Sequence, residues 1–499
     1  MSKTQKILCV DLDGTLVNTD MLWESFLFHL KKNPLVFFYA IFWLLFQGKS
    51  GLKRNLAKNF DFEPKLLPYN QQIISFIQEQ KSKGYTVWLV SASYETIVKK
   101  IYEFLSDKLF DGYYATGLSC SIGSTDKTDK NILNLASKNK SEFLDSIFGP
   151  AGYDYIGNSS ADIKVWNSCD TAYIFCSRKQ GLKYTGSVTN ANNRLIEKEP
   201  DFSTLGSKIK LTLKQVRIHQ WAKNALIFCP ALAVHSILTS EQYGNLVLAF
   251  SSFCFLTSSV YIINDLFDIW NDRAHQKKKN RPLASGNMSI PAGIIIAACC
   301  LSLSSIFALC LSLKFFAFTT LYLAINILYS FKLKNIMALD CVLLSGMYTY
   351  RIFLGCVAAS LANSLWLFSF AIFLFLSLAF IKRYIELFNL KKQGKEQIIG
   401  RPYTVADSSV VETLYIVFGS LSILVFALYL SSTEIQHTFS SIWFAYASLL
   451  VILYWMIYMF IKASRGLIHE DPVVFVLKDR LSLISGLIFV TLFSLGAML

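Results

Sequence analysis

The sequence predicts a chain of two parts, an N-terminal α/β domain and a C-terminal all-α polytopic membrane domain of about nine transmembrane helices. Two observations support this fold class. The composition is 53% hydrophobic and only 16% charged, whereas soluble domains carry about 25% charged residues. Long apolar runs recur from about residue 206 onward, after some two hundred mostly polar residues. We therefore expect domains at 1–177 and 206–499, joined by a linker at 178–205 that is rich in Gly and Asn.

The N-terminal part alternates short apolar runs with helical patterns. We expect strands at 6–10, 85–90, 153–157 and 171–176, and helices over about 20–60, 94–106 and 140–148. This order predicts an open α/β sheet with a helical insertion after its first strand. Within the insertion, Pro34 to Phe46 is almost wholly apolar but too short for a straightforward membrane span. We interpret it as an interfacial or membrane-docking helix, with a buried helix as the alternative.

The C-terminal part contains apolar runs long enough to cross a hydrocarbon core of about 30 Å. We place spans at 224–240, 246–264, 290–312, 315–331, 338–360, 364–381, 409–430, 440–461 and 482–499. The loops after even-numbered spans hold most of the Lys and Arg, and the opposite loops hold Lys314 alone. By the positive-inside rule the basic loops face the cytosol. We expect a multi-pass protein of the cytoplasmic membrane with a cytosolic N-terminal domain.

The net charge of +14 fits nucleic acid, an anionic membrane surface or phosphate-rich substrates. The positive charge is concentrated in the loops after even-numbered spans, where it sets the orientation of the membrane spans. We therefore expect no nucleic-acid partner. Only four apolar residues precede Asp11, which predicts no signal peptide. The 11 cysteines show no C-x-x-C pair and no zinc-ligand spacing. We interpret them as reduced packing residues.

Asp11 and Asp13 follow the first predicted strand in Val10-Asp11-Leu12-Asp13-Gly14-Thr15. This position is the edge at which α/β sheets bind ligands. Two carboxylates so spaced can share Mg²⁺ while one attacks phosphorus and the other handles the leaving-group proton. An Asx-rich turn is the alternative interpretation.

The motif resembles the haloacid dehalogenase superfamily, and the resemblance extends over about residues 5–177. It implies a Rossmannoid phosphatase domain with a helical cap at about 17–70, in which Asp11 and Asp13 are catalytic. Ser91, after an apolar strand, resembles the hydroxyl that binds the transferring phosphoryl group. Lys140 would neutralise the aspartyl-phosphate, and the alternatives for this role are Lys127, Lys130 and Lys138.

The segment Gly157-Asn158-Ser159-Ser160-Ala161-Asp162 resembles the superfamily's metal-binding loop. The resemblance implies that Asp11, Asp13, Asn158 and Asp162 hold Mg²⁺. The superfamily more often has Asp where Asn158 stands, so this chain loses a carboxylate but keeps an oxygen ligand. That departure leaves open a catalytically impaired or purely docking domain.

A second group of carboxylates lies at the end of the second predicted span, in Asn264-Asp265-Leu266-Phe267-Asp268-Ile269-Trp270-Asn271-Asp272. Spacings of three and four predict Asp265, Asp268 and Asp272 on one helical face. Carboxylates beside hydrocarbon are costly, which favours a functional role, and clustered carboxylates hold Mg²⁺ together with phosphate oxygens. The basic run from His275 through Lys278 to Arg281 predicts an anion clamp. A solvated helix end is the alternative.

This pattern resembles the UbiA superfamily of intramembrane prenyltransferases over about residues 206–499. Aromatic prenyltransferases of that superfamily carry a second Asp-rich motif after span six, where this chain has Lys382-Arg383-Tyr384-Ile385-Glu386. The pattern resembles the decaprenyl-phosphate phosphoribosyltransferase branch, and the match includes the segment Arg217-Ile218-His219-Gln220-Trp221-Ala222-Lys223-Asn224. That branch favours Pro and Arg at the positions of Ile218 and His219. A juxtamembrane aromatic and basic belt is the alternative for Arg217, Trp221 and Lys223.

The resemblance implies that Asp265, Asp268 and Asp272 are catalytic Mg²⁺ ligands. The implied substrate-binding residues are Arg217, Lys223, Asn224, Asn264, His275, Lys278, Arg281, Tyr329, Lys334, Asp340, Arg351, Lys382, Arg383 and Glu386.

The two resemblances together imply a bifunctional membrane enzyme. It would transfer 5-phosphoribosyl from phosphoribosyl pyrophosphate to a polyprenyl phosphate lipid, and its N-terminal domain would remove the 5-phosphate to give polyprenyl-phosphoryl ribose. One alternative is a prenyltransferase acting on an aromatic or quinone precursor. The other is the same transferase with a non-catalytic N-terminal docking domain.

Overall fold

The computed structural model describes residues 6–106, 109–117, 134–190, 192–199, 204–233, 238–397, 401–432, 439, 441–469 and 471–498. The chain divides into two compact units. The first unit is Met1–Val216 with Ile262–Ile296, and the second is Arg217–Tyr261 with Ala297–Leu499. The boundaries of these units differ from the predicted domain limits. The segment around the Asp265 motif makes most of its contacts with the N-terminal unit and belongs to it.

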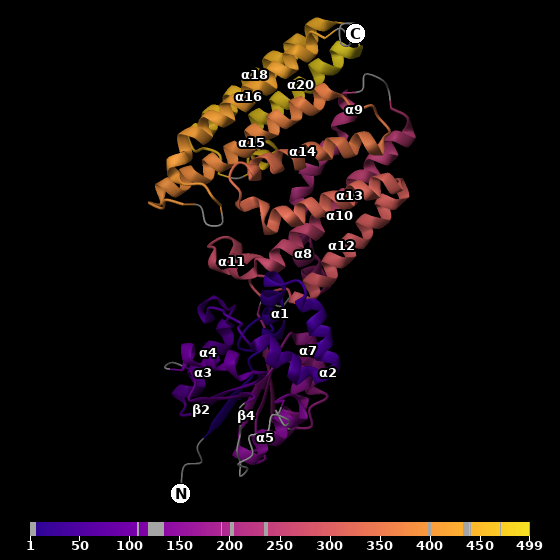
Figure 1. The fold of residues 1–499 in the computed structure, drawn as a ribbon. Coiled ribbons are helices and arrows are strands. Elements are labelled where there is room, and N and C mark those ends of the chain that lie inside the picture. Colours follow the sequence, from indigo (N-terminus) through magenta and orange to yellow (C-terminus); the bar gives the residue numbers. More distant parts are fainter. Residues whose placement is uncertain are drawn as a thin grey trace. The chain divides into compact units, whose positions relative to one another are not determined.

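A six-stranded parallel sheet forms the centre of the first unit, in the order β3-β2-β1-β4-β5-β6 (Figure 1). The strands are β1 (Ile7–Val10), β2 (Thr86–Tyr94), β3 (Gly112–Thr116), β4 (Asp154–Gly157), β5 (Ala172–Cys176) and β6 (Asn193–Glu197). In the central register Val10 lies between Leu89 and Ile156. The predicted α/β class is confirmed, and β1, β2, β4 and β5 match the four expected strands.

The interpretation of residues 178–205 as a linker is wrong for most of that segment. It contains α7 (Arg178–Thr185) and β6, which pairs with β5 from Asn193 to Glu197. A Cβ on Gly181 of α7 would meet the Leu195 side chain at 2.3 Å, so the helix packs closely on this edge strand. With apolar residues only at Leu195 and Ile196, the strand has too weak a pattern to be recognised in the sequence.

Helices cover both faces of the sheet, and each face has its own buried apolar cluster. Besides α7, the helices of this unit are α1 (Met21–Lys32), α2 (Val36–Ala57), α3 (Gln71–Ser82), α4 (Glu95–Leu105), α5 (Lys138–Phe148), α6 (Ile163–Ser168) and α8 (Leu205–Val216), with the short 3₁₀ turns η1 (Pro64–Leu66) and η2 (Ser160–Asp162). The starts of α1 and α3 follow capping rules, because Asp20 accepts from Leu22 N and Asn70 from Gln72 N.

The segment Ile262–Ile296 is joined to this α/β unit by buried polar contacts. It contains α11 (Ile269–Ala274) and η4 (Lys278–Asn280). The Arg273 guanidinium lies 2.6 Å from the Glu24 carboxylate of α1, and both side chains are almost completely buried. Gly286 has φ of +74°, and a Cβ there would meet Asn18 O at 2.1 Å, so only glycine permits this approach.

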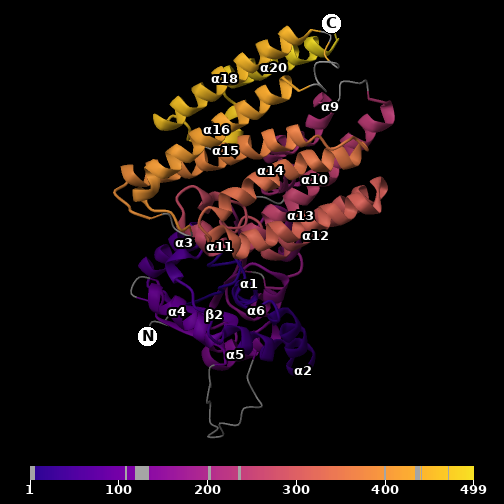
Figure 2. The same ribbon diagram turned by 45° about the horizontal axis from the view of Figure 1, so that its top comes forward.

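The membrane part contains seven helices that are long and apolar enough to cross a bilayer, counted over the described residues. The long helices are α10 (Ser240–Phe267), α12 (Ile290–Leu311), α13 (Leu313–Phe331), α14 (Leu339–Ala358), α15 (Leu365–Lys392), α16 (Ser408–Leu430, preceded by η6, Val405–Asp407) and α18 (Ile442–Ser464). In the second unit α15, α16, α18 and α20 (Arg480–Met498) run side by side in Figures 1 and 2. The chain is a multi-pass membrane protein.

Seven of the nine predicted spans are confirmed, and α20 lies at the ninth but has a shorter apolar stretch, Arg480–Gly496. The first prediction, 224–240, is wrong over the residues described. They form η3 (Ile218–Phe228) and the short α9 (Cys229–Ala233), and residues 234–237 lie outside the described set. The 3₁₀ segment begins at Arg217 with a left-handed φ of 57°. It buries Lys223 and Asn224, so the residues in front of the expected span are part of a polar site.

Candidate active sites

The first candidate site lies at the carboxyl end of β1, where the sheet positions Asp11. Its backbone N–H donates to Ile156 O of β4 at 3.0 Å. Lys140 of α5 donates from Nζ to Asp11 Oδ1 at 2.8 Å and to the Tyr155 hydroxyl at 2.9 Å, and its Nζ lies 3.9 Å from Asp162. The structure therefore brings Asp11, Lys140 and Asp162 together, although they are far apart in the sequence.

Among the alternatives for the lysine, Lys138 pairs on the surface with Glu142 at 3.1 Å. Lys127 and Lys130 lie outside the described residues. Within the part that the structure describes, Lys140 is the alternative that contacts Asp11.

Asp13 is held by three donors. Met21 N donates to Oδ1 at 2.8 Å, while the Ser93 and Ser91 hydroxyls lie 2.7 and 3.4 Å from Oδ2. Ser93 lines the adjacent cavity of about 500 Å³, but Ser91, which is fully buried, does not. Sequence reasoning missed Ser93, because Ser91 follows the apolar run directly, whereas β2 continues three residues further to Tyr94.

The cavity contains four carboxylates, Asp11, Asp13, Asp20 and Asp162, and three amines, Lys53, Lys140 and Lys198. Burial raises the pKa of Asp11 to about 7 against the opposing effect of Lys140. Burial and the neighbouring Asp20 raise the pKa of Asp13 to about 6. Carboxylates thus outnumber the amines, and a phosphate group entering here requires additional positive charge.

Mg²⁺ fits this donor set, with Asp11 and Asn158 as its side-chain ligands. The Asn158 amide lies so close to the Asp11 loop that a Cβ on Gly14 would meet its Nδ2 at 2.2 Å. Asp162 is already saturated: it accepts from Tyr155 OH, Asn158 N, Ser159 N and the Ser159 hydroxyl at 2.9–3.2 Å. It therefore orients the loop and Lys140, and Asp11 is left as the main anionic ligand.

The cavity wall also includes residues from the segment after Arg281, within the same unit. They are Gly286, Ser289, Ile290 and Pro291, and the last two begin the membrane span α12. Residues of the α/β domain and the first turn of a membrane helix therefore line one cavity.

The second candidate site contains two of the three predicted aspartates. Arg281 Nη1 lies 3.0 Å from Asp265 Oδ1 and 2.5 Å from Asp272 Oδ2. Gln215 Nε2 donates to the other Asp265 oxygen at 2.9 Å. Burial raises the pKa of Asp272, and Arg281 opposes this effect. Because one cation already bridges the two carboxylates, their arrangement fits a shared Mg²⁺.

The prediction that Asp268 lies on the same helical face is wrong. The helix α10 ends at Phe267, and Asp268 is the non-helical residue before α11, with φ of −102° and ψ of 15°. Its Oδ1 lies 2.9 Å from Lys31 Nζ of α1. Over the described residues, no group of three Asp, Glu, His or Cys side chains is arranged to hold a metal ion. The break in the helix separates Asp268 from the other two carboxylates.

The neighbouring predicted residues take different positions. Asn264 is partly buried in α10. His275 accepts from Lys277 N at 3.2 Å, and both His275 and Lys278 are exposed. Of the predicted basic clamp, Arg281 contacts the carboxylates directly.

In the second unit, Lys223 and Lys382 share one carboxylate. Their Nζ atoms lie 3.1 and 3.0 Å from the two oxygens of Asp471. Burial raises the pKa of Asp471, but Lys382 and Lys223 together hold it well below its usual range. Two cations around one anion leave an excess positive charge for a phosphate. The sequence alone did not identify Asp471 as the partner of these lysines, because neither lysine is near it in the chain.

Asp340 and Arg383 form a buried ion pair at 2.7 Å, with both side chains 0% exposed. Arg383 also contacts Glu386 at 2.6 Å, and Asp340 accepts from Tyr403 OH at 2.8 Å. Arg401 lies 3.3 Å from Asp340 and donates to Tyr329 OH and the Lys334 carbonyl, each at 3.1 Å. This network connects five of the predicted residues, and Arg383 lies inside it rather than at a surface that a substrate reaches.

Arg351 and Asn224 form a third buried group. Arg351 Nε donates to Asn224 Oδ1 at 3.2 Å, and Nη2 donates to Tyr322 OH at 3.1 Å. The guanidinium also lies 4.9 Å from the centre of the Tyr348 ring. Arg217 stacks over Tyr261 at 5.1 Å. Buried cations next to aromatic rings are stabilised by the ring quadrupole.

Replacing Arg383 with Ala is expected to destabilise the protein by about 3–5 kcal/mol, because it leaves the buried Asp340 carboxylate without its main counter-ion. Thermal unfolding of the purified protein in detergent measures the effect. Lys391→Ala, at an exposed position of the same helix, is the control. Equal unfolding temperatures for the two variants would contradict the structural role.

Comparison with known proteins assigns the membrane part to a class of intramembrane transferases. The model of the UbiA prenyltransferase family matches residues 225–470, and the chain belongs to this family. Over nearly its whole length it is 32% identical to an uncharacterized protein, y4nM, of Sinorhizobium fredii, across 97% of this chain and 90% of that protein.

Two further relatives match parts of the chain. The nodulation protein NoeC of Azorhizobium caulinodans is 31% identical over 54% of this chain and 87% of its own length. A decaprenyl-phosphate phosphoribosyltransferase of Corynebacterium glutamicum is 31% identical over 186 residues, 36% of this chain and 56% of its own length.

Solved structures align with each part separately. A UbiA homolog from Archaeoglobus fulgidus bound to GPP and Mg²⁺ covers 57% of this chain and 98% of its own, at 18% identity and a TM-score of 0.44. A phosphoserine phosphatase covers 39% of this chain and 95% of its own, at 19% identity and a TM-score of 0.27. The chain is thus a UbiA-family membrane transferase whose N-terminal unit is a parallel α/β domain.

Proposed function

We propose that the chain transfers 5-phosphoribosyl from phosphoribosyl pyrophosphate to a polyprenyl phosphate, and that its N-terminal domain then removes the 5-phosphate. The observation that carries the transfer is the similarity to a decaprenyl-phosphate phosphoribosyltransferase. A second observation supports it. Where aromatic prenyltransferases carry their second Asp-rich motif, this chain has the basic residue Lys382. Lys382 and Lys223 both pair with Asp471, so their two positive charges exceed its single negative charge.

For the transfer step, Asp265 and Asp272 would hold Mg²⁺, which would supply a Lewis acid for the leaving pyrophosphate. The C1–O bond to pyrophosphate breaks, and a phosphate oxygen of the lipid forms the new bond to C1. That oxygen is already anionic, so the chain needs no strong general base. Lys223 and Lys382 bind a phosphate group of a substrate. A lipid-walled site excludes water, which is the competing nucleophile.

In the hydrolytic step, Asp11 attacks the 5-phosphorus, and Asp13 protonates the departing ribose oxygen. Asp13 then takes a proton from the water that attacks the aspartyl-phosphate, which releases inorganic phosphate and regenerates Asp11. Lys140 neutralises charge next to Asp11, and the Ser93 hydroxyl is positioned to bind a phosphoryl oxygen. Each of these groups lines the same cavity.

The wall of this cavity supports a lipid-linked substrate. Ile290 and Pro291, the first residues of span α12, line it together with the catalytic aspartates. A phosphosugar attached to a membrane lipid therefore reaches Asp11 without leaving the bilayer surface. We propose that this surface is the cytosolic one, because the basic loops predict it.

The decisive experiment supplies the purified protein with labelled phosphoribosyl pyrophosphate and a polyprenyl phosphate, or with 4-hydroxybenzoate and a prenyl diphosphate. We expect labelled lipid from the first mixture alone. Prenylated aromatic product from the second mixture would instead establish an aromatic prenyltransferase.

A non-catalytic N-terminal domain is the second candidate. The Asn at position 158 favours it, because Asp162 is saturated and Asp11 is left as the main anionic metal ligand. Release of inorganic phosphate from the labelled lipid product by the full-length protein distinguishes the two: a docking domain releases none.

Replacing Lys382 with Ala is expected to raise the KM for a phosphorylated substrate by about tenfold or more, because a charge-assisted contact is lost. The Mg²⁺ concentration for half-maximal activity should stay unchanged, since Asp265 and Asp272 are intact. Substrate titrations at fixed Mg²⁺ measure the first quantity. A changed Mg²⁺ requirement with an unchanged KM would argue against phosphate binding at this lysine. Lys391→Ala again serves as the control.

A further inference from the structure

Helix α2 of the N-terminal unit has two halves with different surroundings. They meet at Gly48, whose φ of 67° and ψ of −174° interrupt the helix. The second half packs into the domain through Gly51, Leu56 and Ala57. The first half leaves nine large apolar side chains exposed at 45–74%: Leu35, Phe37, Phe38, Tyr39, Ile41, Phe42, Leu44, Leu45 and Phe46. Contiguous exposed apolar surface of this kind marks an interaction site.

The exposed half has no polar face for water. Every position from Leu35 to Phe46 is apolar or aromatic, so consecutive residues cover all sides of the helix. At 1.5 Å per residue, these twelve residues extend only about 18 Å. That is too short to cross a hydrocarbon core of about 30 Å, so a position in the plane of an interface fits the length.

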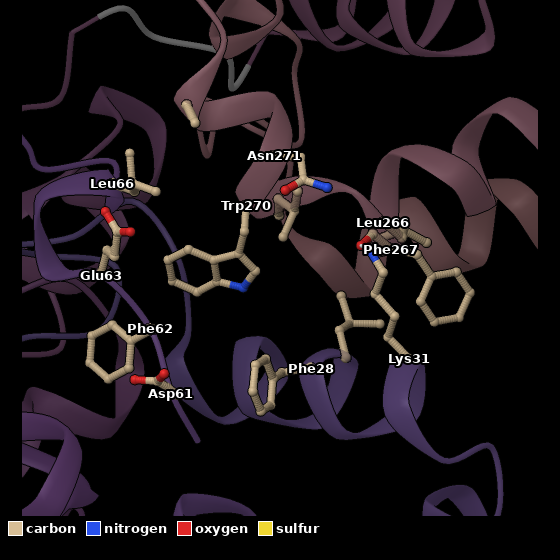
Figure 3. A pocket seen from close by; sticks show the side chains of 13 residues that line it. Phe28, Lys31, Asp61, Phe62, Glu63, Leu66, Leu266, Phe267, Trp270 and Asn271 are labelled. Carbon is tan, nitrogen blue, oxygen red and sulfur yellow. Dashed lines mark hydrogen bonds between the residues drawn. The ribbon is translucent and has the colours of Figure 1, made fainter. Parts of the chain in front are cut away.

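The preceding helix fixes this segment next to the last turns of α10, Ile262–Phe267, which belong to the same unit. Lys31, which lies beside Phe267 in Figure 3, donates from Nζ to the carbonyl oxygen of Phe267, the last residue of α10, at 2.8 Å. The same Nζ lies 2.9 Å from Asp268 Oδ1. Lys31 is four residues before Leu35, a reach of at most about 14 Å. The buried pair of Glu24 and Arg273 makes this attachment rigid. The apolar half of α2 therefore begins at the level where α10 ends.

The flanking residues indicate what covers this surface. Exposed Lys32 and Lys49 bracket the segment, and six of its residues are aromatic: Phe37, Phe38, Tyr39, Phe42, Trp43 and Phe46. Aromatic rings and flanking lysines are typical of helices at the boundary between lipid headgroups and acyl chains. Lysines near an anionic leaflet gain further attraction.

We propose that the apolar half of α2, Leu35–Phe46, lies in the bilayer interface on the face of the membrane where α10 ends. This surface is continuous with the bilayer that α10 and α12 cross, and it needs no second protein. The other half of α2 carries Lys53, whose Nζ donates to Ala92 O at the cavity of Asp11. One helix thus connects the membrane surface to the candidate phosphatase cavity. The proposal does not depend on that domain being catalytic.

The test places the photoreactive residue p-benzoylphenylalanine at position 42 of the full-length protein, as Phe42→p-benzoylphenylalanine. The protein is reconstituted in liposomes of phosphatidylethanolamine and phosphatidylglycerol, irradiated and analysed by peptide mass spectrometry. We expect lipid adducts at position 42. Phe104→p-benzoylphenylalanine is the matched control, because Phe104 is an aromatic residue of α4 that is also 51% exposed. Its lipid adducts should be at least tenfold fewer.

Two further variants make each outcome decisive. Ile306→p-benzoylphenylalanine, at an exposed position of the span α12, shows that lipid adducts form in the preparation. Phe38→p-benzoylphenylalanine repeats the measurement at a second exposed position should the first variant express poorly. Cross-links from position 42 to a second copy of the chain, or equal lipid adducts at positions 42 and 104, would overturn the proposal. So would the absence of adducts at 42 when position 306 is labelled.

Discussion

Replacement of Asp11 with Asn is expected to stop phosphate release while lipid transfer continues. An amide cannot form the aspartyl-phosphate, so hydrolysis should fall by roughly 10³-fold or more. The second candidate site has its own carboxylates, Asp265 and Asp272, around Arg281. The variant should therefore accumulate polyprenyl-phosphoryl 5-phosphoribose, which mass spectrometry of extracted lipids distinguishes from the wild-type product by one additional phosphate.

Asp61→Asn is the matched control for this change, because Asp61 lies in the same unit with its side chain 87% exposed. It should release phosphate at the wild-type rate. Identical phosphorylated lipids from wild type and the Asp11 variant would show that the N-terminal domain is not the phosphatase for this product. The replacement of the usual aspartate by Asn158 would then be the leading explanation.

Replacement of Asp272 with Asn is expected to lower lipid transfer by roughly 100-fold or more, because one of two carboxylates that share a cation is lost. Arg281 lies between Asp265 and Asp272, and these two carboxylates would be the residues that hold Mg²⁺. Asp265→Asn should have the same effect. Initial rates of label transfer, measured across a range of Mg²⁺ concentrations, give the loss and the altered metal dependence.

Asp61→Asn again controls for the general effect of losing a carboxylate in this unit. The Asp11 cavity should remain active in the Asp272 variant, since Asp11, Asp13 and Lys140 belong to the α/β domain and Asp272 does not line the cavity. Phosphate release from added lipid product tests that the unit is still folded. Wild-type transfer by both Asp265→Asn and Asp272→Asn would remove this carboxylate pair from the mechanism.

Some candidate-site residues could be predicted because their chemistry is local in the sequence. Asp11 and Asp13 follow a strand directly, and Arg281 follows the second aspartate motif within nine residues of Asp272. The structure places Asp11 next to Lys140 and places Arg281 against Asp265 and Asp272. For Arg281 a motif defines both the residue and its immediate surroundings, whereas Lys140 is 129 residues from Asp11 in the chain.

Other features could not be predicted, because they depend on where a helix stops. The spacing of Asp265, Asp268 and Asp272 fits one face only if the helix continues. The helix ends at Phe267, and Lys31 of α1 takes Asp268 as its partner. The predicted span at 224–240 is wrong over the described residues for a related reason. Residues Ile218–Phe228 form a 3₁₀ segment that buries Lys223 and Asn224, and this segment replaces the start of the expected α-helix.

The sequence by itself determined four of the six strands, seven of the membrane spans, the membrane character of the second half and the residue types of each candidate site, because apolar periodicity and short motifs are local properties. Only the tertiary structure decided that Ser93 and not Ser91 lines the cavity, that Asp471 joins Lys223 to Lys382, and that Arg383 is a buried counter-ion of Asp340. The physical reason is that burial and ion pairing depend on packing between segments far apart in the chain. The spacing of residues in the sequence does not show which distant segments pack together.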